Sequence, residues 1–124
     1  MGMKIMKFDQ DKIKVLTADI DGTITKTFCC IEEGEIVGRL DVGDWEKQGG
    51  WISMVFVKED HRNKGICGAM MRKAFATAES EHKSALGLSV RKDNMNARQR
   101  YMFLGFRPAY ESGDSIVMTV HFPD

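Results

Sequence analysis

Apolar and polar residues alternate over the first third of the chain, which predicts β-strands. Residues 12–20 alternate in part and end at Asp21-Gly22, a pair typical of two-residue hairpin turns. Residues 23–32 are rich in β-branched and aromatic side chains, and Glu33-Gly34 predicts a second turn before residues 35–42. The pattern indicates an antiparallel meander. In its third strand one face is expected to hold Ile36, Leu40 and Val42.

The middle of the chain predicts a loop, a central strand and a helix. Residues 44–50 are polar and contain Gly49-Gly50, which indicates a loop, whereas Trp51 to Val57 is apolar on both faces, as in a central strand. Beyond it the spacing of apolar residues changes to that of one helical face. The residues on that face are Cys67, Met71, Ala74, Phe75 and Ala78.

A strand, a second helix and a last strand follow. Residues 85–90 have the apolar character of a buried strand, and Ala97, Tyr101 and Leu104 have helical spacing. Gly105 is expected to end that helix as a left-handed cap. Residues 115–122 form the terminal strand. With no internal repeat or linker, the order predicts a single α/β domain with a mixed sheet over residues 1–124.

Charge removes one class of function. The 18 Lys and Arg residues balance 18 Asp and Glu residues, the pI is 6.8 and hydrophobic residues make up 43% of the chain. A duplex-binding domain usually has a basic surplus that pairs with phosphates, so no nucleic acid partner is expected.

The absence of recognisable targeting signals, together with the cysteine pattern, predicts a cytoplasmic protein. No apolar run reaches the roughly 18 residues of a membrane span, and residues 1–7 lack the apolar block of a signal peptide. No membrane partner is therefore expected. Cys29, Cys30 and Cys67 have no zinc-site spacing, so reduced thiols and no metal are predicted. The adjacent pair should point to opposite faces of a strand, one thiol buried and the other exposed.

Asp19-Ile-Asp21-Gly22-Thr23 after an apolar strand resembles the opening motif of haloacid-dehalogenase-type phosphatases. In such enzymes the first aspartate is the nucleophile and magnesium shields the charges. No later acidic pair of the required form is present. Because Asp-Gly is also the common hairpin dipeptide, a turn is the preferred interpretation.

Residues 57–69 run from an apolar strand through a basic, glycine-containing loop into the first helix. The first amides of a helix lack partners and carry partial positive charge, so this loop can bind a diphosphate. Gly65 permits a sharp turn and Gly68 a close approach, while Arg62 and Lys64 add positive charge. The glycine spacing is neither that of a dinucleotide fingerprint nor that of a Walker loop.

Two motifs here resemble the GNAT family, the Gcn5-related N-acetyltransferases. Their acetyl-CoA loop, Arg/Gln-x-x-Gly-x-Gly/Ala, corresponds to Arg62-Asn-Lys-Gly65-Ile-Cys67, with cysteine as a compact third anchor. A second element, Asn-x-x-Ala-x-x-x-Tyr-x-x-x-Gly-Phe, corresponds to the segment from Asn94 to Phe106. The resemblance implies the GNAT acyl-CoA N-acyltransferase fold, an α/β (α+β) domain with a mixed, mostly antiparallel sheet of about six or seven strands flanked by helices.

The resemblance also implies acetyl transfer from the cosubstrate acetyl-CoA to an amine. By analogy the edge of the central strand would pair with the pantetheine arm, and a backbone N–H there would polarise the thioester carbonyl. The neighbouring strand 85–90 would separate from it beyond Val57. The cofactor-binding residues so predicted are Val55, Phe56, Val57, Arg62, Asn63, Lys64, Gly65, Ile66, Cys67, Gly68 and Asn94.

Tyr101 matches the family's general acid, which would protonate the leaving thiolate. Asn94 can cap the second helix, bind pantetheine, or do both. No base is identified for the acceptor amine. Trp51 stands where the histone acetyltransferase branch has a glutamate. Glu59, Asp60 and His61 are nearby in sequence, and His61 is the preferred candidate among them.

Acceptor specificity in this family generally comes from helices between the first two strands. Residues 9–25 instead indicate strand and turn, so reduced N-terminal helices and an open acceptor side are expected. Such a groove suits a peptide or protein amine, a small amine, or closure by a second copy in a homodimer. Trp45 is a candidate for its lip. The alternative functions are a catalytically idle acyl-CoA-binding or partner-binding module and, third, the phosphatase.

Overall fold

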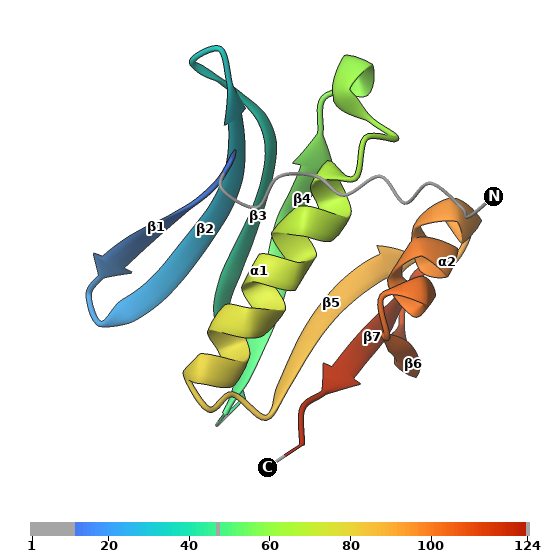
Figure 1. The fold of residues 1–124 in the computed structure, drawn as a ribbon. Helices are drawn as coiled ribbons and strands as arrows, with labels where there is room; N and C mark the ends of the chain where they lie inside the picture. Colours follow the sequence, from blue (N-terminus) through green and yellow to red (C-terminus); the bar gives the residue numbers. More distant parts are fainter. Residues whose placement is uncertain (1–11, 47, 124) are drawn as a thin grey trace, which may run out of the picture.

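The computed structural model describes residues 12–46 and 48–123, which form one seven-stranded sheet with two helices (Figure 1). The order across the sheet is β1-β2-β3-β4-β5-β7-β6. All neighbouring strands are antiparallel except β4 and β5. The elements are β1 (Ile13–Ile20), β2 (Thr23–Glu32), β3 (Glu35–Trp45), β4 (Gly49–Val57), a 3-10 turn (Glu59–His61), α1 (Ile66–Ser80), β5 (Ala85–Arg91), α2 (Met95–Phe103), β6 (Arg107–Ser112) and β7 (Ser115–His121).

The predicted mixed sheet, meander and helices are confirmed. Asp21 and Gly22 both have positive φ, as a type I′ turn requires, and Gly22 N–H donates to the Asp19 carboxylate at 3.0 Å. The phosphatase-like motif therefore lies in a hairpin turn. Because β1 and β2 are joined by these two residues alone, the structure has no helix between them. The prediction of strand and turn covered residues 9–25, of which residues 9–11 lie outside the described residues.

One prediction about strand limits is wrong, and one strand was not predicted. Residues 44–50 are not a loop, since β3 runs to Trp45 and β4 begins at Gly49. Residues 107–112, for which no element was predicted, form the edge strand β6. The sequence does not indicate this strand, because it contains Pro108 and all of its residues are exposed, so apolar and polar positions do not alternate along it.

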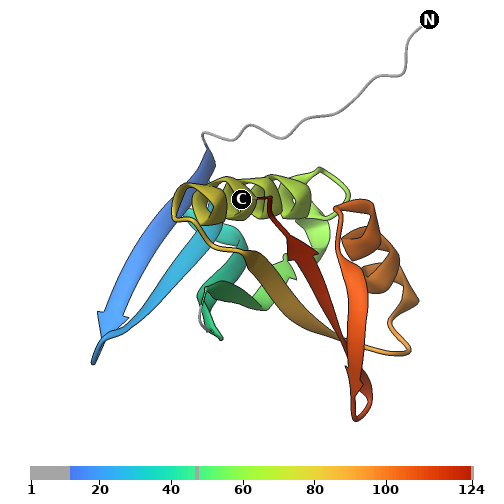
Figure 2. The same ribbon diagram turned by 90° about the horizontal axis from the view of Figure 1, so that it is seen from below.

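Both helices lie on the same side of the sheet (Figure 2). The core between α1 and the sheet includes Phe28, Leu40, Met70, Leu86 and Met118, each fully buried. Phe75 of α1 contacts Phe106 and Phe122, with ring centroids 5.7 and 5.9 Å apart. We call the opposite side the bare face, because no helix of the described residues covers it.

Residues in register share a face, and this explains one wrong prediction about the cysteines. Cys29 pairs with Lys14 on one side and Arg39 on the other, on the bare face, whereas Cys30 belongs to the core. Both thiols are fully buried, although one was expected to be exposed. Lys14 and Arg39 have longer side chains than cysteine, and long side chains on the same face of a sheet can cover a short one.

Irregular register changes which residues face the core. Ile36 was expected to share a face with Leu40, but it is exposed while Val37 is buried. The β2–β3 pairing shifts between Cys30 and Ile31, and this shift reverses the alternation there.

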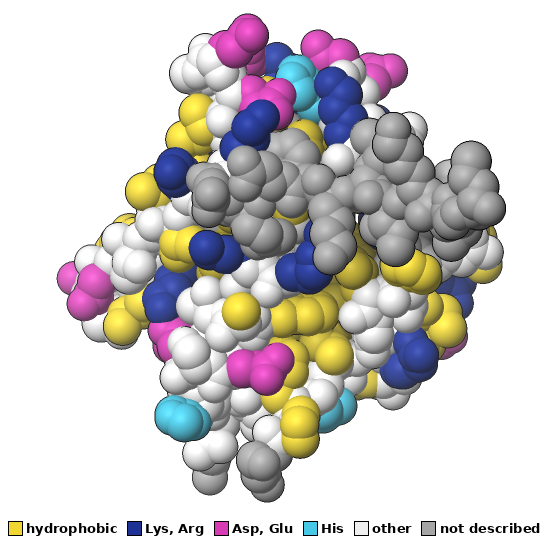
Figure 3. All heavy atoms as spheres, in the orientation of Figure 1, with side chains coloured by type: hydrophobic (Ala, Val, Ile, Leu, Met, Phe, Trp, Pro, Cys, Tyr) yellow, Lys and Arg dark blue, Asp and Glu magenta, His cyan; other side chains and the backbone are white. Residues whose placement is uncertain are grey.

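Charged residues of both signs are interspersed over the visible described surface on the helix-bearing side (Figure 3). No single-sign field is seen on that part of the surface, which agrees with the balanced composition. Within residues 12–46 and 48–123, neither helix is long and apolar enough to cross a membrane.

Candidate functional site

The sheet splits at its centre, between β4 and β5. These two strands pair only from Gly49 to Trp51 on β4 and from Ala85 to Gly87 on β5. The separation thus begins earlier than the expected point after Val57. Beyond Trp51, the β5-facing edge of β4 has no partner among the described strands, which leaves backbone groups available to a ligand.

A bulge in β4 marks the same place. Arg39 pairs with Phe56 and Asp41 with Ser53, so Met54 and Val55 of β4 stand opposite Leu40 alone. Met54 has φ of 57°, in the left-handed region that methionine rarely adopts. Backbone conformations of this kind cost free energy and cluster at functional sites.

A cleft of about 460 Å³ lies at the split. One wall is the end of β4, another is the loop and first turn of α1, and the third is α2. The lining residues are Val55, Phe56, Val57, His61, Arg62, Asn63, Gly65, Ile66, Cys67, Gly68, Asn94, Ala97, Arg100 and Tyr101. Every predicted cofactor-binding residue except Lys64 is among them, together with the predicted acid Tyr101.

The first amides of α1, beside the cleft, have no hydrogen-bond acceptor among the described residues. Gly65 is the N-cap, with φ of 87°, a conformation that favours glycine. The first intrahelical hydrogen bond runs from Ala69 N–H to Gly65 O at 3.0 Å, so the amides of Ile66, Cys67 and Gly68 precede it. No acidic residue occurs in the first turn of the helix. This end of α1 suits an anion.

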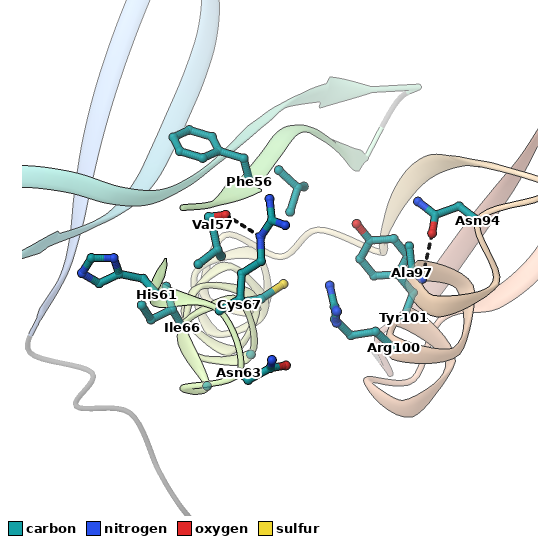
Figure 4. A pocket seen from close by; sticks show the side chains of 14 residues that line it. Phe56, Val57, His61, Asn63, Ile66, Cys67, Asn94, Ala97, Arg100 and Tyr101 are labelled. Atoms are coloured by element: carbon teal, nitrogen blue, oxygen red, sulfur yellow. Dashed lines mark hydrogen bonds between the residues drawn. The ribbon is translucent and has the colours of Figure 1, made fainter. Parts of the chain in front are cut away.

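Positive charge lines the cleft and negative charge does not. Its described lining includes Arg62 and Arg100 but no aspartate or glutamate. Arg62 Nε donates to Val57 O at 2.9 Å, which ties the loop to the end of β4. Arg100 reaches from α2 toward Cys67 and Asn63 (Figure 4). Arg100 was not predicted from the sequence, where its only signal is its place beside Tyr101 in the second motif.

Tyr101 faces the cleft from α2 (Figure 4), and its ring also packs against Phe106 with centroids 5.9 Å apart. Burial raises the pKa of Tyr101, with a smaller contribution from nearby Cys67. Burial likewise raises the pKa of Cys67, while the charge of Arg100 lowers it. Both groups therefore hold their protons at neutral pH.

Asn94 caps α2, as the sequence predicted. Its Oδ1 accepts a hydrogen bond from Ala97 N–H at 3.2 Å. Its amide nitrogen keeps two donors that can serve a ligand in the cleft.

The candidate base and the candidate lip residue are both engaged in other contacts. His61 Nδ1 lies 2.7 Å from Asp60 Oδ1, and its Nε2 lies 3.3 Å from Glu32 Oε2. Trp45 is not a loop residue but the last residue of β3. Its ring packs on that of Trp51, with centroids 5.4 Å apart. A Cβ atom on Gly87 would come within 2.8 Å of the Trp45 ring, so glycine makes room for this contact.

The family model for the GNAT acetyltransferase family matches residues 6–106. The chain belongs to the GNAT family. A comparison with curated proteins found no match.

Solved GNAT structures share its fold. One is PaiA N-acetyltransferase from Thermoplasma acidophilum in complex with coenzyme A, with a TM-score of 0.74 and 13% identity over 79% of this chain and 61% of that one. Another is a GNAT family acetyltransferase from Elizabethkingia anophelis with acetyl-CoA bound, with a TM-score of 0.73 and 17% identity over 90% of this chain and 99% of that one. A third is the ribosomal-protein-S18-alanine N-acetyltransferase from Escherichia coli, with a TM-score of 0.68 and 21% identity over 77% of this chain and 67% of that one. This GNAT chain thus spans less than two thirds of the first of these proteins.

Within the described residues no group of three or more His, Cys, Asp or Glu side chains could hold a metal ion.

Proposed function

We propose that the protein is an N-acetyltransferase, a single GNAT domain that moves the acetyl group of acetyl-CoA to a primary amine. The observation that carries the proposal is the cleft at the β4–β5 split. It joins an open strand edge, the acid-free start of α1 and a partly buried tyrosine in one space. These are the three features that a diphosphate, an amide arm and a leaving thiolate require.

The loop and first turn of α1 would bind the diphosphate. The amides of Ile66, Cys67 and Gly68 are free to donate, and Arg100 supplies charge from the opposite wall. The pantetheine arm would lie along Val55 to Val57. There a backbone N–H near the bulge would donate to the thioester oxygen as negative charge develops on it.

The chemical step would be direct attack of the amine nitrogen on the thioester carbonyl carbon. The C–S bond breaks as the new C–N bond forms, and Tyr101 would donate a proton to the leaving thiolate. A tyrosine whose pKa is raised still holds this proton at neutral pH. The proton of the amine would leave to solvent on the open side of the sheet, because Trp51 has no basic group and both ring nitrogens of His61 already contact carboxylates.

The acceptor would be a peptide or protein amine or a small amine. The two-residue connection between β1 and β2 supports an open acceptor side. A protein amine has a parallel in the ribosomal-protein-S18-alanine N-acetyltransferase, one of the similar structures.

The absence of a carboxylate from the described cleft lining favours one rival, an idle acyl-CoA-binding module that has no base for the amine. The test is thiol release from acetyl-CoA with a panel of amines, alongside calorimetric titration of acetyl-CoA. Binding with turnover supports the transferase. Binding without turnover on any amine, and with no effect of Tyr101→Phe, supports the module.

A further inference from the structure

The side from which an acceptor would approach follows from the positions of the helices. Both α1 and α2 lie on one side of the sheet (Figure 2), and the candidate donor cleft lies between them. Beyond Trp51 no described strand fills the sheet between β4 and β5, beside this cleft. An acceptor amine would therefore reach the thioester from the bare face, beside β4.

One row of residues crosses the bare face next to the split. Lys14, Cys29, Arg39 and Phe56 are consecutive register partners on β1, β2, β3 and β4. Phe56 lines the cleft, so Arg39 is the charged residue of the row that lies next to it. The Arg39 side chain is 40% exposed and can meet a ligand.

Arg39 is held in a fixed orientation. Its Nε and Nη2 each donate to Asp41, to Oδ1 and Oδ2, at 3.0 Å. Asp41 is buried and also accepts from Thr27 Oγ1 at 2.8 Å. The hydrogen bond to Asp41 raises the pKa of Arg39, which therefore stays charged.

This arrangement leaves donors, and no free acceptor, for a substrate. A guanidinium has five N–H donors, and Asp41 occupies two of them. The Asp41 carboxylate already accepts from both neighbours, so a second cation gains little from it. A carboxylate matches the planar fork of a guanidinium better than a neutral group does.

We propose that Arg39, held by Asp41, binds a carboxylate that the acceptor carries close to its amine. The inference rests on the proposed acetyltransferase function and narrows its substrate class to amines with a neighbouring carboxylate. A fixed guanidinium pays little entropy on binding, so it favours such acceptors over amines that lack the group.

The test compares matched pairs of acceptors: L-lysine with 1,5-diaminopentane, and L-phenylalanine with phenethylamine. We expect kcat/KM to be about tenfold or more higher for the carboxylate-bearing member of a pair. Arg39→Met should bring the ratio close to one by raising KM for that member alone. Because this change leaves Asp41 buried without its partner, the double variant Arg39→Met/Asp41→Asn is measured as well.

Lys14→Met is the matched control, since it removes a cation from the same row two strands away. It should leave the ratio unchanged, and every variant should bind acetyl-CoA as the wild type does. Equal turnover of both members, no turnover of any carboxylate-bearing amine, or a ratio unaffected by Arg39→Met would overturn the inference. If the wild type does not bind acetyl-CoA, the proposed function fails with it. If acetyl-CoA binds and amines without a carboxylate react equally well, only the role of Arg39 fails.

Discussion

Arg62 donates from Nε to the main-chain oxygen of Val57 at 2.9 Å, so the first residue of the loop motif is tied to the last residue of β4. This contact fixes the loop against the strand edge along which the pantetheine arm would lie. It also directs part of the Arg62 guanidinium toward the protein. Arg100, on the opposite wall, is the cation with which the diphosphate would interact more freely.

Arg100→Met should therefore weaken acetyl-CoA binding. A charge-assisted hydrogen bond to phosphate contributes about 1.5–3 kcal/mol, so we expect the dissociation constant to rise about tenfold or more. Isothermal titration calorimetry measures this directly. Arg98→Met is the control on the same helix, because Arg98 lies outside the cleft lining and donates to Lys92 O. Equal affinities for wild type and Arg100→Met would remove Arg100 from the binding site.

Gly68→Glu should also weaken acetyl-CoA binding, because it places bulk and negative charge at the start of α1. Gly68→Ala is the matched control. Its Cβ would lie 3.2 Å from Arg72 Nη1, at the movable end of a long side chain, so the fold can adjust. We expect about a tenfold loss of affinity for the glutamate variant and little for the alanine variant. The loop assignment is wrong if calorimetry finds the same affinity in both.

Tyr101→Phe should lower kcat while leaving the affinity for acetyl-CoA unchanged. Removing a general acid costs about a hundredfold or more in rate, whereas the phenylalanine ring preserves the contact with Phe106. Steady-state thiol release, with an amine that the wild type acetylates, gives kcat. A variant with full activity would show that the leaving thiolate takes its proton from elsewhere.

Stability at high pH should depend on Tyr101. Because folding raises the pKa of Tyr101, the folded state keeps the phenolic proton at a pH where the unfolded state loses it. The stabilisation is present in full below the unfolded pKa of about 10 and is lost as pH rises through the folded value. Urea denaturation between about pH 9 and 11 should show a steeper fall in the free energy of unfolding for wild type than for Tyr101→Phe. Parallel curves would contradict the raised pKa.

The elements that local patterns determine were predictable. The helical spacing of Cys67, Met71 and Ala74 identified α1, because one apolar face must meet the sheet. Asp21-Gly22 identified the first hairpin, because both positions need positive φ. The two family motifs placed the loop, Asn94 and Tyr101, and the structure brings these together in the cleft.

The features that depend on distant contacts were not predictable. The left-handed backbone conformation of Met54 belongs to the bulge in the pairing of β3 with β4. The early split of the sheet belongs to the short pairing of β4 with β5. Trp45 was wrongly predicted to lie in a loop, because its ring contacts Trp51 and lies against Gly87, and a local sequence pattern does not reveal such tertiary contacts. Arg100 has no signal beyond its place in the second motif, since its position matters only once α2 lies across the cleft from α1.

The most direct test of the acetyl-CoA site is a crystal structure of the protein with coenzyme A. The diphosphate should lie on the amides of Ile66 to Gly68, the pantetheine arm along Val55 to Val57, and the thiol within hydrogen-bonding distance of the Tyr101 hydroxyl. Coenzyme A bound at another place on the protein, or no binding at all, would contradict the account.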